Sequence, residues 1–447
     1  MVQQSVNKVA VIGYGITGQS CATFLLNQDI EVSVFVSDLE TVNVDNAKDQ
    51  NRKLIAFFRL DDDTDLSNFD YAVVSPGIDL KHPALTKALK DGVELISEIE
   101  LFSRHNSAPV IAVTGSNGKS TVVDMLHKGL VAANINTGLG GNIGTSAISL
   151  LEGAYSLIVL EISSFQLELT YSLKPKIACV LNVTEDHIDR HGDVKEYAAV
   201  KRRIYEGAEI CIVNRDDAAT HANKCDNVFS FGHSRAMQQN QSCNDEEGIW
   251  IDGECVIAQH RLLHQSQHNL LNLQVVLLIA KHILNSEQQV LFTESLLGYT
   301  GLPHRFETCF KMVNNKNMPV TFIDDSKATN PGATVSAINS VDAQSDLVLI
   351  VGGDSKQADL HELASLVATR VDLLLCLGKD ADLFMPMSNH SHKFDDLEAL
   401  VAFAIKQIQD VSRPTVVMLS PACASIDMFK NFKQRGQQFQ QYVRRCA

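Results

Sequence analysis

Residues 110–122 read Val-Ile-Ala-Val-Thr-Gly-Ser-Asn-Gly-Lys-Ser-Thr-Val, and this stretch decides the fold. The apolar run at 110–113 predicts a buried strand, and apolar residues recurring at helical spacing over 122–130 predict a helix directly after it. Between them, Gly115 and Gly118 let the backbone wrap around a phosphate while N–H groups at the start of the helix point towards it. The stretch therefore predicts a phosphate-binding loop in a parallel α/β sheet.

The residues around these glycines bear on the chemistry. Lys119 carries a positive charge for a transferring phosphoryl group, and the hydroxyl of Ser120 or Thr121 can bind Mg²⁺. The generic motif begins with glycine where this chain has Val113, so a tight strand-to-helix turn that merely needs glycine is the alternative. The intact Gly-Lys-Ser-Thr run favours a phosphate site. We expect this loop to bind the phosphate groups of a ligand through Gly115, Ser116, Asn117, Gly118, Lys119, Ser120 and Thr121.

Length and composition limit the class of protein. A chain of 447 residues fits roughly three domains, and 45% apolar with 20% charged residues is typical of globular proteins. A net charge of −15 leaves no excess of Lys and Arg for nucleic acid, which we do not expect as a partner. With no signal-peptide pattern and no run of roughly 20 apolar residues, we expect a cytoplasmic protein without membrane insertion. The ten scattered cysteines predict free thiols in a reducing cytoplasm.

Alternating apolar runs and amphipathic stretches divide the chain into three blocks. Strands are expected at 9–12, 32–36, 71–74, 110–113, 157–160, 177–181, 210–213, 320–323, 347–351, 373–377 and 415–419. The fold class is therefore α/β, with three consecutive doubly wound domains: a Rossmann-like domain at 1–97, a P-loop ATPase-type domain at 98–301 and a second Rossmann-like domain at 302–447. Residues 249–257, around Asp252-Gly253, predict a hairpin that forms a small antiparallel appendage of the central domain.

Two polar residues follow strands of the central block. Glu161 ends a predicted buried strand, and the carboxyl ends of parallel strands lie beside the phosphate loop. A carboxylate there suits Mg²⁺, although a helix-capping Glu is the alternative reading. His187 also follows a strand, but the residue alone indicates only a polar loop histidine, because Mg²⁺ prefers oxygen to imidazole.

The N-terminal block carries Gly13, Gly15 and Gly18 in the spacing of a dinucleotide fingerprint. The acidic residue expected at the end of the second strand is Val36, with Asp38 two residues later. An NAD enzyme is therefore one reading, and another phosphate-bearing ligand is favoured over it.

Longer segments distributed along the whole chain resemble the Mur ligase family. They are residues 75–78 (SPGI), 114–121, 141–144 (GNIG), 161–166 (EISSFQ), 182–187 (NVTEDH), 267–269 (QHN), 301–307 (GLPHRFE), 325–330 (DSKATN) and 420–425 (SPACAS). The ATP loop, HRFE and DSKATN are shared across the family. The SPGI segment, SSFQLE, and SPACAS followed by FKNF at 429–432 point to its D-glutamate-adding branch.

The resemblance implies an ATP-dependent acid–amino-acid ligase of peptidoglycan synthesis. ATP would phosphorylate the terminal carboxylate of UDP-N-acetylmuramoyl-L-alanine, and the amine of D-glutamate would attack the acyl phosphate. A carboxylate is a poor electrophile until one oxygen becomes a phosphate leaving group, which explains the need for the loop. We expect small-molecule partners only and a monomer.

The resemblance also implies a role for particular residues. Lys119, Lys201, His187 and Glu161 would be catalytic, with two Mg²⁺ ions held by Ser120, Glu161, His187 and Lys201 as a carbamate. Further ATP contacts would be Asn272, Arg305, Asp325 and Lys327. The UDP substrate would be bound by Gly15, Ile16, Thr17, Ser37, Ser75, Gly77, Asn142 and Ser163, and D-glutamate by Thr329, Lys356, Ser425 and Phe432.

Several points stay open in the sequence. The D-glutamate-adding pattern has an Asp near Val36, so either Asp38 substitutes for it or backbone groups hold the uridine. Another Mur ligase or a folylpolyglutamate synthetase would keep the ATP residues and add a different amino acid, although the Asp-Asn-Pro-Arg motif expected of the diaminopimelate-adding member is missing. An NAD-dependent oxidoreductase and a nucleotide-regulated scaffold are the readings from other functional classes.

Overall fold

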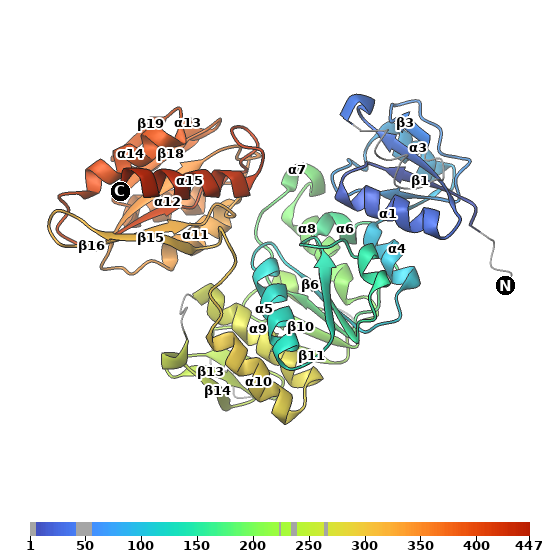
Figure 1. Cartoon of the computed structure of the whole chain (residues 1–447), viewed down its shortest axis with the longest axis horizontal. Coiled ribbons are helices and arrows are strands. Elements are labelled where there is room, and N and C mark those ends of the chain that lie inside the picture. Colours follow the sequence, from blue (N-terminus) through green and yellow to red (C-terminus); the bar gives the residue numbers. More distant parts are fainter. Residues whose placement is uncertain (1–5, 42–55, 223–224, 234–238, 263–266) are drawn as a thin grey trace. The chain divides into compact units, whose positions relative to one another are not determined.

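The computed structural model describes residues 6–41, 56–222, 225–233, 239–262 and 267–447 (Figure 1). The chain forms two compact units. The first comprises Met1–Val183, Lys195–Leu262 and Leu271–Gly298, and the second comprises Thr184–Val194, Leu263–Leu270 and Tyr299–Ala447. Three largely parallel sheets confirm the predicted α/β class. The domain boundaries at 97 and 301 stay a prediction.

The N-terminal sheet has the strand order β3-β2-β1-β4-β5, and all its strands are parallel. Its elements are β1 (Lys8–Ile12), α1 (Ile16–Asn27), β2 (Glu31–Val36), η1 (Leu39–Thr41), β3 (Ala56–Arg59), β4 (Tyr71–Val74), α3 (Pro83–Lys90), β5 (Glu94–Ile96) and α4 (Glu98–His105). Apolar residues of α1 and α4 pack on one face of the sheet and those of α3 on the other. The strand order changes direction between β1 and β4, and ligands of such sheets bind at that point.

The central sheet is also parallel, with the order β11-β10-β9-β6-β8-β7. Its elements are β6 (Val110–Thr114), α5 (Lys119–Ala132), β7 (Thr137–Gly141), η2 (Ile148–Glu152), β8 (Leu157–Glu161), α6 (Ser164–Leu167), β9 (Ile177–Val180), α8 (Val194–Arg202), η3 (Arg203–Tyr205), β10 (Ile210–Asn214), η4 (Ala218–Thr220), β11 (Val228–Phe231), α9 (Gln267–Ile283) and α10 (Ser286–Leu297). β6 has β8 and β9 as neighbours, so the loops that follow these three strands leave the same edge of the sheet. One apolar cluster continues from the N-terminal sheet through α4 into this sheet.

The predicted hairpin is confirmed and belongs to a three-stranded antiparallel sheet. Its strands are β12 (Ser242–Asn244), β13 (Gly248–Ile251) and β14 (Glu254–Ala258), followed by η5 (Gln259–Arg261). Asp252 and Gly253 both have positive φ, 51° and 84°, as a tight two-residue hairpin turn requires.

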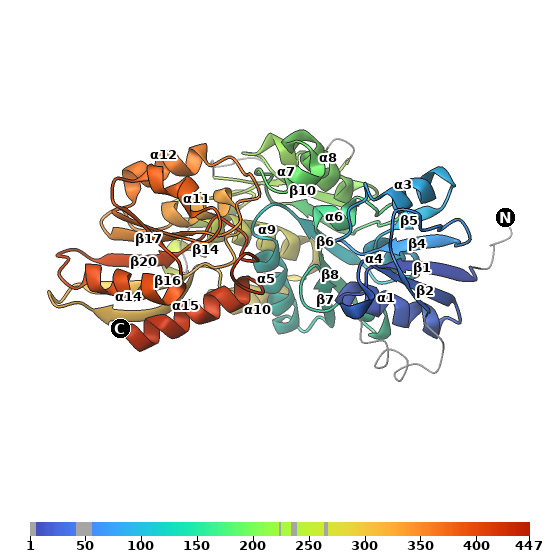
Figure 2. The same ribbon diagram turned by 90° about the horizontal axis from the view of Figure 1, so that it is seen from above.

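The third sheet lies in the second unit and has the order β15-β16-β20-β17-β18-β19. Only its edge strand β15 is antiparallel to its neighbour. The elements are α7 (Ile188–His191), β15 (Glu307–Val313), β16 (Pro319–Asp324), α11 (Pro331–Asn339), β17 (Asp346–Gly352), α12 (His361–Arg370), β18 (Leu373–Leu377), α13 (Ala381–Phe384), η6 (Met385–Met387), β19 (Ser391–Phe394), α14 (Leu397–Ile408), β20 (Thr415–Leu419) and α15 (Phe432–Cys446). Helices α11, α12 and α13 pack on one face, and α14 with α15 on the other. Figure 2 shows α11 and α12 on the opposite side of this sheet from α14 and α15.

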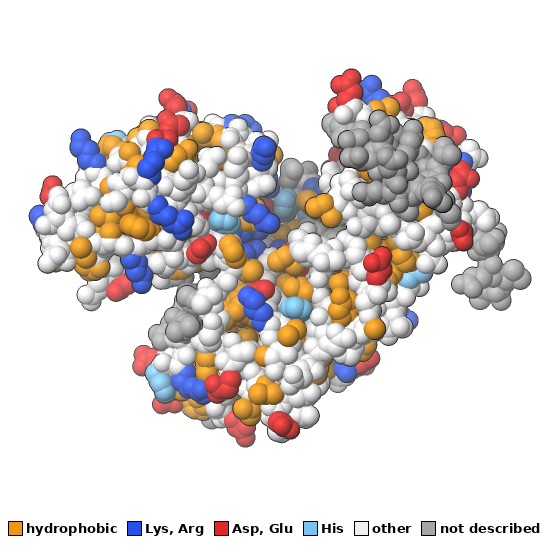
Figure 3. All heavy atoms as spheres, in the orientation of Figure 1, with side chains coloured by type: hydrophobic (Ala, Val, Ile, Leu, Met, Phe, Trp, Pro, Cys, Tyr) orange, Lys and Arg blue, Asp and Glu red, His pale blue; other side chains and the backbone are white. Residues whose placement is uncertain are grey.

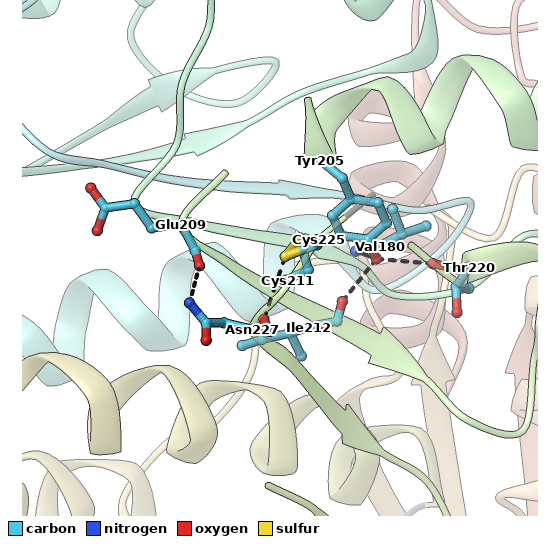
Figure 4. Close-up of a disulfide and its surroundings, with 8 residues drawn as sticks. All are labelled: Val180, Tyr205, Glu209, Cys211, Ile212, Thr220, Cys225 and Asn227. Carbon is cyan, nitrogen blue, oxygen red and sulfur yellow. Dashed lines mark hydrogen bonds between the residues drawn. A yellow bond between two sulfur atoms is a disulfide. The ribbon is translucent and has the colours of Figure 1, made fainter. Parts of the chain in front are cut away.

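One expectation about the cysteines is wrong. Cys211 of β10 and Cys225, which precedes β11, form a disulfide (Figure 4). β10 and β11 are parallel neighbours, and the backbone N–H of Cys211 donates to the carbonyl of Asn227, which brings the segment before β11 alongside β10. The two cysteines are 14 residues apart in the sequence, and the pairing of β10 with β11 brings their segments together. Eight other cysteines are free thiols.

The surface carries both signs of charge. On the face shown in Figure 3, Lys and Arg side chains are interspersed with Asp and Glu. Among the described residues, no helix has the length and apolar character that crossing a membrane requires.

Candidate active site

The glycine loop connects the end of β6 to the start of α5, as predicted. Gly118 is the residue before the helix and has a φ of +84°, which favours glycine. A Cβ atom on Gly118 would lie 2.8 Å from Oδ1 of Asn272, so glycine is required for this close approach as well. The structure therefore brings Asn272, a predicted ATP contact on α9, against the loop.

A second asparagine, Asn182, lies two residues after β9 and contacts the loop. Oδ1 of Asn182 accepts a hydrogen bond from the backbone N–H of Asn117 at 2.8 Å, and its Nδ2 donates to the carbonyl of Asn117 at 3.2 Å. The backbone carbonyl of Asn182 also accepts from the N–H of Ser116 at 2.9 Å. Asn182 thus holds the loop in shape, a role that the sequence reasoning missed. Its sequence signals were its position after a predicted strand of the same sheet and its place at the start of the NVTEDH segment.

Two lysines converge on one carbonyl of the loop. Nζ of Lys119 donates to the carbonyl oxygen of Gly115 at 2.7 Å and to that of Ser116 at 2.9 Å. Nζ of Lys201 donates to the same Gly115 oxygen at 2.8 Å. Lys201 lies on α8 with only 1% of its surface exposed, and its ammonium is 4.3 Å from the centre of the Tyr197 ring. Lys201 is therefore a buried residue of the phosphate loop's surroundings, whereas its helix position alone indicated a surface lysine.

Glu161 ends β8 and is almost completely buried, with 2% of its surface exposed. Its Oε1 accepts a hydrogen bond from Nδ2 of Asn142 at 2.8 Å, and its backbone carbonyl accepts from the N–H of Asn142. Within the described part of the chain, Oε2 is buried and has no hydrogen-bond partner. An orphaned carboxylate oxygen in such a place is costly unless a cation or donor completes it.

The other predicted residues of this region have different surroundings. Ser120 and Thr121 are buried in the first turn of α5. Ser163 caps α6, accepting from the N–H of Gln166 in a capping box. His187 belongs to the second unit, whereas Glu161 belongs to the first. It precedes α7 with a φ of +55°, and its Nε2 lies 3.7 Å from a carboxylate oxygen of Asp186.

The N-terminal glycine loop lies where the strand order changes direction. A Cβ on Gly13 would lie 2.9 Å from Oγ of Ser75, and that hydroxyl donates to the Gly13 carbonyl at 3.3 Å. The loop after β1 and the SPGI loop after β4 are therefore side by side. Gly15 precedes α1, Ile16 is 78% exposed, and a Cβ on Gly77 would meet open space. The predicted uridine contacts thus surround an accessible backbone.

The end of β2 differs from that of a typical NAD site. Val36 is buried and points into the core, while Ser37 and Asp38 directly after it are exposed. Oδ1 of Asp38 accepts a hydrogen bond from the N–H of Glu40 at 2.9 Å. Thr17 lies in the first turn of α1. An acidic side chain therefore follows β2 two residues later than the fingerprint places it.

In the second unit, the HRFE and DSKATN segments form one loop cluster at the end of β16. The N–H of Phe306 donates to Oδ1 of Asp325 at 3.1 Å, and the N–H of Lys327 donates to the carbonyl of His304 at 3.0 Å. Burial raises the pKa of Asp325 to about 7, although hydrogen bonds from Ser420 and Phe306 and the charge of Arg305 act in the opposite direction. The structure therefore brings Arg305, Asp325 and Lys327 together.

The predicted D-glutamate residues come from loops at the same edge of this sheet. The loop after β17 pairs with the SPACAS loop through two backbone hydrogen bonds between Asp354 and Ala424, at 3.0 and 2.9 Å. Lys356, in the first of these loops, has a φ of +51°, and Ser425, in the second, is buried. Phe432 begins α15, and its ring centre lies 4.2 Å from Nζ of Lys327. Thr329, in the DSKATN segment, is partly buried.

One grouping of possible metal ligands was not predicted. Among the described residues, His304, Glu307 and Asp324 each offer a ligand atom within 4.8 Å of the others. Nδ1 of His304 is 2.7 Å from Oδ2 of Asp324, and Gln440 donates to both Asp324 and Glu307. Their polar atoms are therefore engaged with one another in a hydrogen-bond network.

Comparison with known families covers most of the chain. The Mur ligase MurD-like N-terminal domain matches residues 7–97, the Mur ligase middle domain matches 113–280, and the Mur ligase glutamate ligase domain matches 304–423. A UDP-N-acetylmuramoylalanine–D-glutamate ligase from Pseudoalteromonas translucida is 38% identical over 442 residues, which are 98% of this chain and 97% of that relative. The chain belongs to the Mur ligase family.

Further members of the family agree with this placement. Ligases with the same name from Haemophilus influenzae and Escherichia coli are 37% and 38% identical over 96% of both chains. Among solved structures, UDP-N-acetylmuramate-alanine ligase from Thermotoga maritima has a TM-score of 0.60 at 16% identity, covering 99% of this chain and 100% of that one. A MurF ligase from the same organism, in complex with ADP, has a TM-score of 0.61 at 16% identity, with coverage of 99% and 97%. These structures share the Mur ligase fold.

Proposed function

We propose that the chain is an ATP-dependent ligase that joins D-glutamate to UDP-N-acetylmuramoyl-L-alanine in the synthesis of peptidoglycan precursors, acting as a monomer in the cytoplasm. The observation that carries this proposal is the 37–38% identity, along 96–98% of the chain, to relatives named for that reaction. The loops of both units supply groups that suit its steps.

The reaction joins an amine to a carboxylate by way of an acyl phosphate. A carboxylate oxygen of the muramoyl substrate forms a bond to the γ-phosphorus of ATP as the bond to the β-phosphate oxygen breaks, and ADP leaves. The amine of D-glutamate then attacks the acyl carbon, and the tetrahedral intermediate expels phosphate and releases a proton. Catalysis of phosphoryl transfer depends mainly on positioning and on charge stabilisation.

The glycine loop supplies the positioning of ATP. The residues Gly115, Ser116, Asn117, Gly118, Lys119, Ser120 and Thr121 surround the phosphates with backbone N–H groups from the start of α5. In the structure Lys119 donates to two loop carbonyls, and with ATP bound its ammonium turns to the γ-phosphate. Asn272, beside Gly118, lies at the edge of the same site.

The residues near the loop fit a magnesium site. The buried Oε2 of Glu161, which lacks a partner among the described residues, suits a hard cation, and the buried hydroxyl of Ser120 would be a second oxygen ligand. The resemblance implies that His187 and a carbamylated Lys201 would be further ligands of two Mg²⁺ ions. When bound, Mg²⁺ offsets the negative charge of the phosphate groups.

The surroundings of Lys201 favour its conversion to a carbamate. Its ammonium is buried and shares one carbonyl with the ammonium of Lys119, so two like charges lie close together. Attack of the neutral amine on CO₂ forms a nitrogen–carbon bond, releases a proton and leaves a negatively charged carbamate. The change removes the repulsion and creates oxygen ligands.

The remaining contacts divide between the two units. In the first, Gly15, Ile16, Thr17, Ser37, Ser75 and Gly77 bind the UDP part, with Asp38 available to the uridine, while Asn142 and Ser163 bind the muramoyl part. In the second, Arg305, Asp325 and Lys327 contact the nucleotide. Lys356 pairs with a carboxylate of D-glutamate, Thr329 and Ser425 donate hydroxyl hydrogen bonds, and Phe432 packs against its carbon chain.

An isotope experiment tests the acyl phosphate. With ¹⁸O in the terminal carboxylate of UDP-N-acetylmuramoyl-L-alanine, ATP and D-glutamate, we expect one ¹⁸O atom in the released phosphate, and no phosphate release when any substrate is omitted. Phosphate without label would contradict the route through a phosphorylated carboxylate.

The carbamate has its own test. We expect Lys201→Ala to lower kcat by roughly 100-fold or more, because a buried charged ligand is lost, and short carboxylic acids to restore part of the activity. Lys195→Ala is the matched control, since Lys195 is an exposed lysine on the same helix. Activity of Lys201→Ala equal to that of the control would reject the carbamate.

A further inference from the structure

Arg435 is the largest fully buried side chain among the described residues, and the reaction described above does not use it. It lies in the first turn of α15 with 1% of its surface exposed. Burial lowers the pKa of Arg435 to about 10, so the guanidinium remains charged at neutral pH. Burying a charged group costs free energy, so the contacts that Arg435 makes indicate why it is buried.

The guanidinium connects two loops. Its Nε donates to Oγ of Ser326 at 3.0 Å, and Nη2 donates to the carbonyl of the same residue at 2.8 Å. Nη1 and Nη2 both donate to the carbonyl of Cys423, at 3.2 and 3.1 Å. Over the part of the chain that the structure describes, Arg435 forms no ion pair with Asp or Glu, and its acceptors are uncharged. The planar guanidinium, which acts as a fork of several N–H donors, therefore fixes the distance between the backbone at Ser326 and the backbone at Cys423.

These two segments carry contacts that the second unit is proposed to make with ATP and with D-glutamate. Ser326 stands between Asp325 and Lys327, which are assigned to the nucleotide, and Cys423 lies two residues before Ser425, which is assigned to D-glutamate. A second bond joins the same segments, because Oγ of Ser420 donates to Oδ2 of Asp325 at 2.8 Å.

Gly436 and Gln440, on the same helix as Arg435, determine how closely the first turns of α15 approach the neighbouring loops. A Cβ on Gly436 would lie 2.4 Å from Nδ1 of His304 and 2.7 Å from Oδ2 of Asp324, so only glycine allows this approach. Nε2 of Gln440 donates to Asp324 at 2.8 Å and to Glu307 at 3.2 Å. Residues four apart share a helix face, so the helix contacts the HRFE, DSKATN and SPACAS segments from one side.

We propose that Arg435 is a positioning residue that keeps residues 325–327 and 420–425 in one arrangement, so that its loss impairs the use of ATP and of D-glutamate together. This inference rests on the function proposed above. Arg435 does not contact substrate, because it is buried and its nitrogens are engaged by Ser326 and Cys423. Its effect passes through Asp325, Lys327 and Ser425.

The test is the Arg435→Lys variant, since a lysine keeps the charge and loses the fork. Small displacements of binding groups have large kinetic effects, so we expect the KM for ATP and the KM for D-glutamate each to rise roughly 10- to 100-fold. The KM for UDP-N-acetylmuramoyl-L-alanine, whose assigned contacts are in the first unit, is expected to change by less than about twofold. A merely structural loss would lower the fraction of active enzyme, and hence kcat, and would leave all three KM values unchanged.

Arg370→Lys is the matched control. Arg370 ends α12 in the same unit and, among the described residues, donates to the backbone carbonyls of Val341, Asp342 and Ser345, which belong to none of the proposed site loops. We expect its three KM values to match the parent's. Ser326→Ala, which removes the acceptor of Arg435 Nε and keeps the charge, is expected to shift the same two KM values in the same direction and decides the matter if Arg435→Lys does not fold.

The outcomes separate the inference from the function on which it rests. A parent enzyme without activity towards the three substrates overturns the proposed function and this inference with it. An active parent, with folded Arg435→Lys or Ser326→Ala showing parental KM values for ATP and D-glutamate, overturns the inference alone.

Discussion

Replacement of Asn182 by Ala removes the side-chain brace of the phosphate loop while leaving every proposed ATP contact in place. The two hydrogen bonds between the Asn182 amide and the backbone of Asn117, at 2.8 and 3.2 Å, are lost. The bond from the N–H of Ser116 to the Asn182 carbonyl is kept, because it uses only backbone atoms.

The magnitude follows from these two bonds. Each neutral hydrogen bond contributes about 1 kcal/mol, so up to about 2 kcal/mol of loop organisation is lost. If the binding of ATP must supply this free energy to order the loop around the phosphates, the KM for ATP rises by roughly 10- to 30-fold. The KM for the muramoyl substrate is expected to stay within about twofold of the parent value, since its assigned contacts are elsewhere.

The assay is phosphate release at varied ATP with the other substrates saturating. Asn106→Ala is the matched control, because the Asn106 amide also donates one and accepts one backbone hydrogen bond, with Ala108, at 2.7 and 3.1 Å. A KM for ATP in Asn182→Ala that equals the value in Asn106→Ala would refute the reasoning.

Three further predictions follow from single features. Gly118→Ala is expected to destabilise the fold by about 1–3 kcal/mol and to weaken ATP binding, because of the positive φ and the clash with Asn272; an unchanged thermal midpoint and KM would contradict this. Because the pKa of Asp325 is raised in the folded state, ionisation of its carboxyl lowers the free energy of unfolding as pH rises from about 4 to about 7, by at most roughly 4 kcal/mol. Asp325→Asn should therefore unfold at a higher urea concentration than the parent at pH 8. Near pH 4 the two proteins should unfold at the same urea concentration. Alkylation of the denatured, unreduced protein should modify eight of the ten cysteines, and reduction of Cys211–Cys225 should lower the free energy of unfolding by up to about 3 kcal/mol; ten modified cysteines without reductant would exclude the disulfide.

The sequence predicted the buried strands well, because their signal is local. The apolar runs at 110–113, 347–351 and 415–419 lie in strands of the central and third sheets, and the hairpin at Asp252-Gly253 is present. The edge strands of all three large sheets were missed, namely β3, β5, β7, β11, β15 and β19. Of these, β3 and β19 are short and half-exposed, with the sequences AFFR and SHKF, so they lack a run of apolar residues.

From the residues alone, the site was predicted only where a local motif marks it, and the family resemblance implied the other site residues. The glycine loop has such a motif, whereas the brace from Asn182 spans 65 residues and the fork of Arg435 spans 109. Lys201 reads as a surface lysine until the fold buries it beside Gly115, 86 residues away. The sheet topology that brings these residues together is not expressed in any short stretch of sequence, and the same holds for the disulfide.

The choice of amino acid tests the central claim most directly. Phosphate release is measured with UDP-N-acetylmuramoyl-L-alanine and ATP in the presence of D-glutamate, L-glutamate or diaminopimelate, and the product is identified by mass. We expect turnover with D-glutamate alone, with a product heavier by one glutamyl residue. Turnover with L-glutamate or diaminopimelate in its place would contradict the account and indicate a different amide ligase.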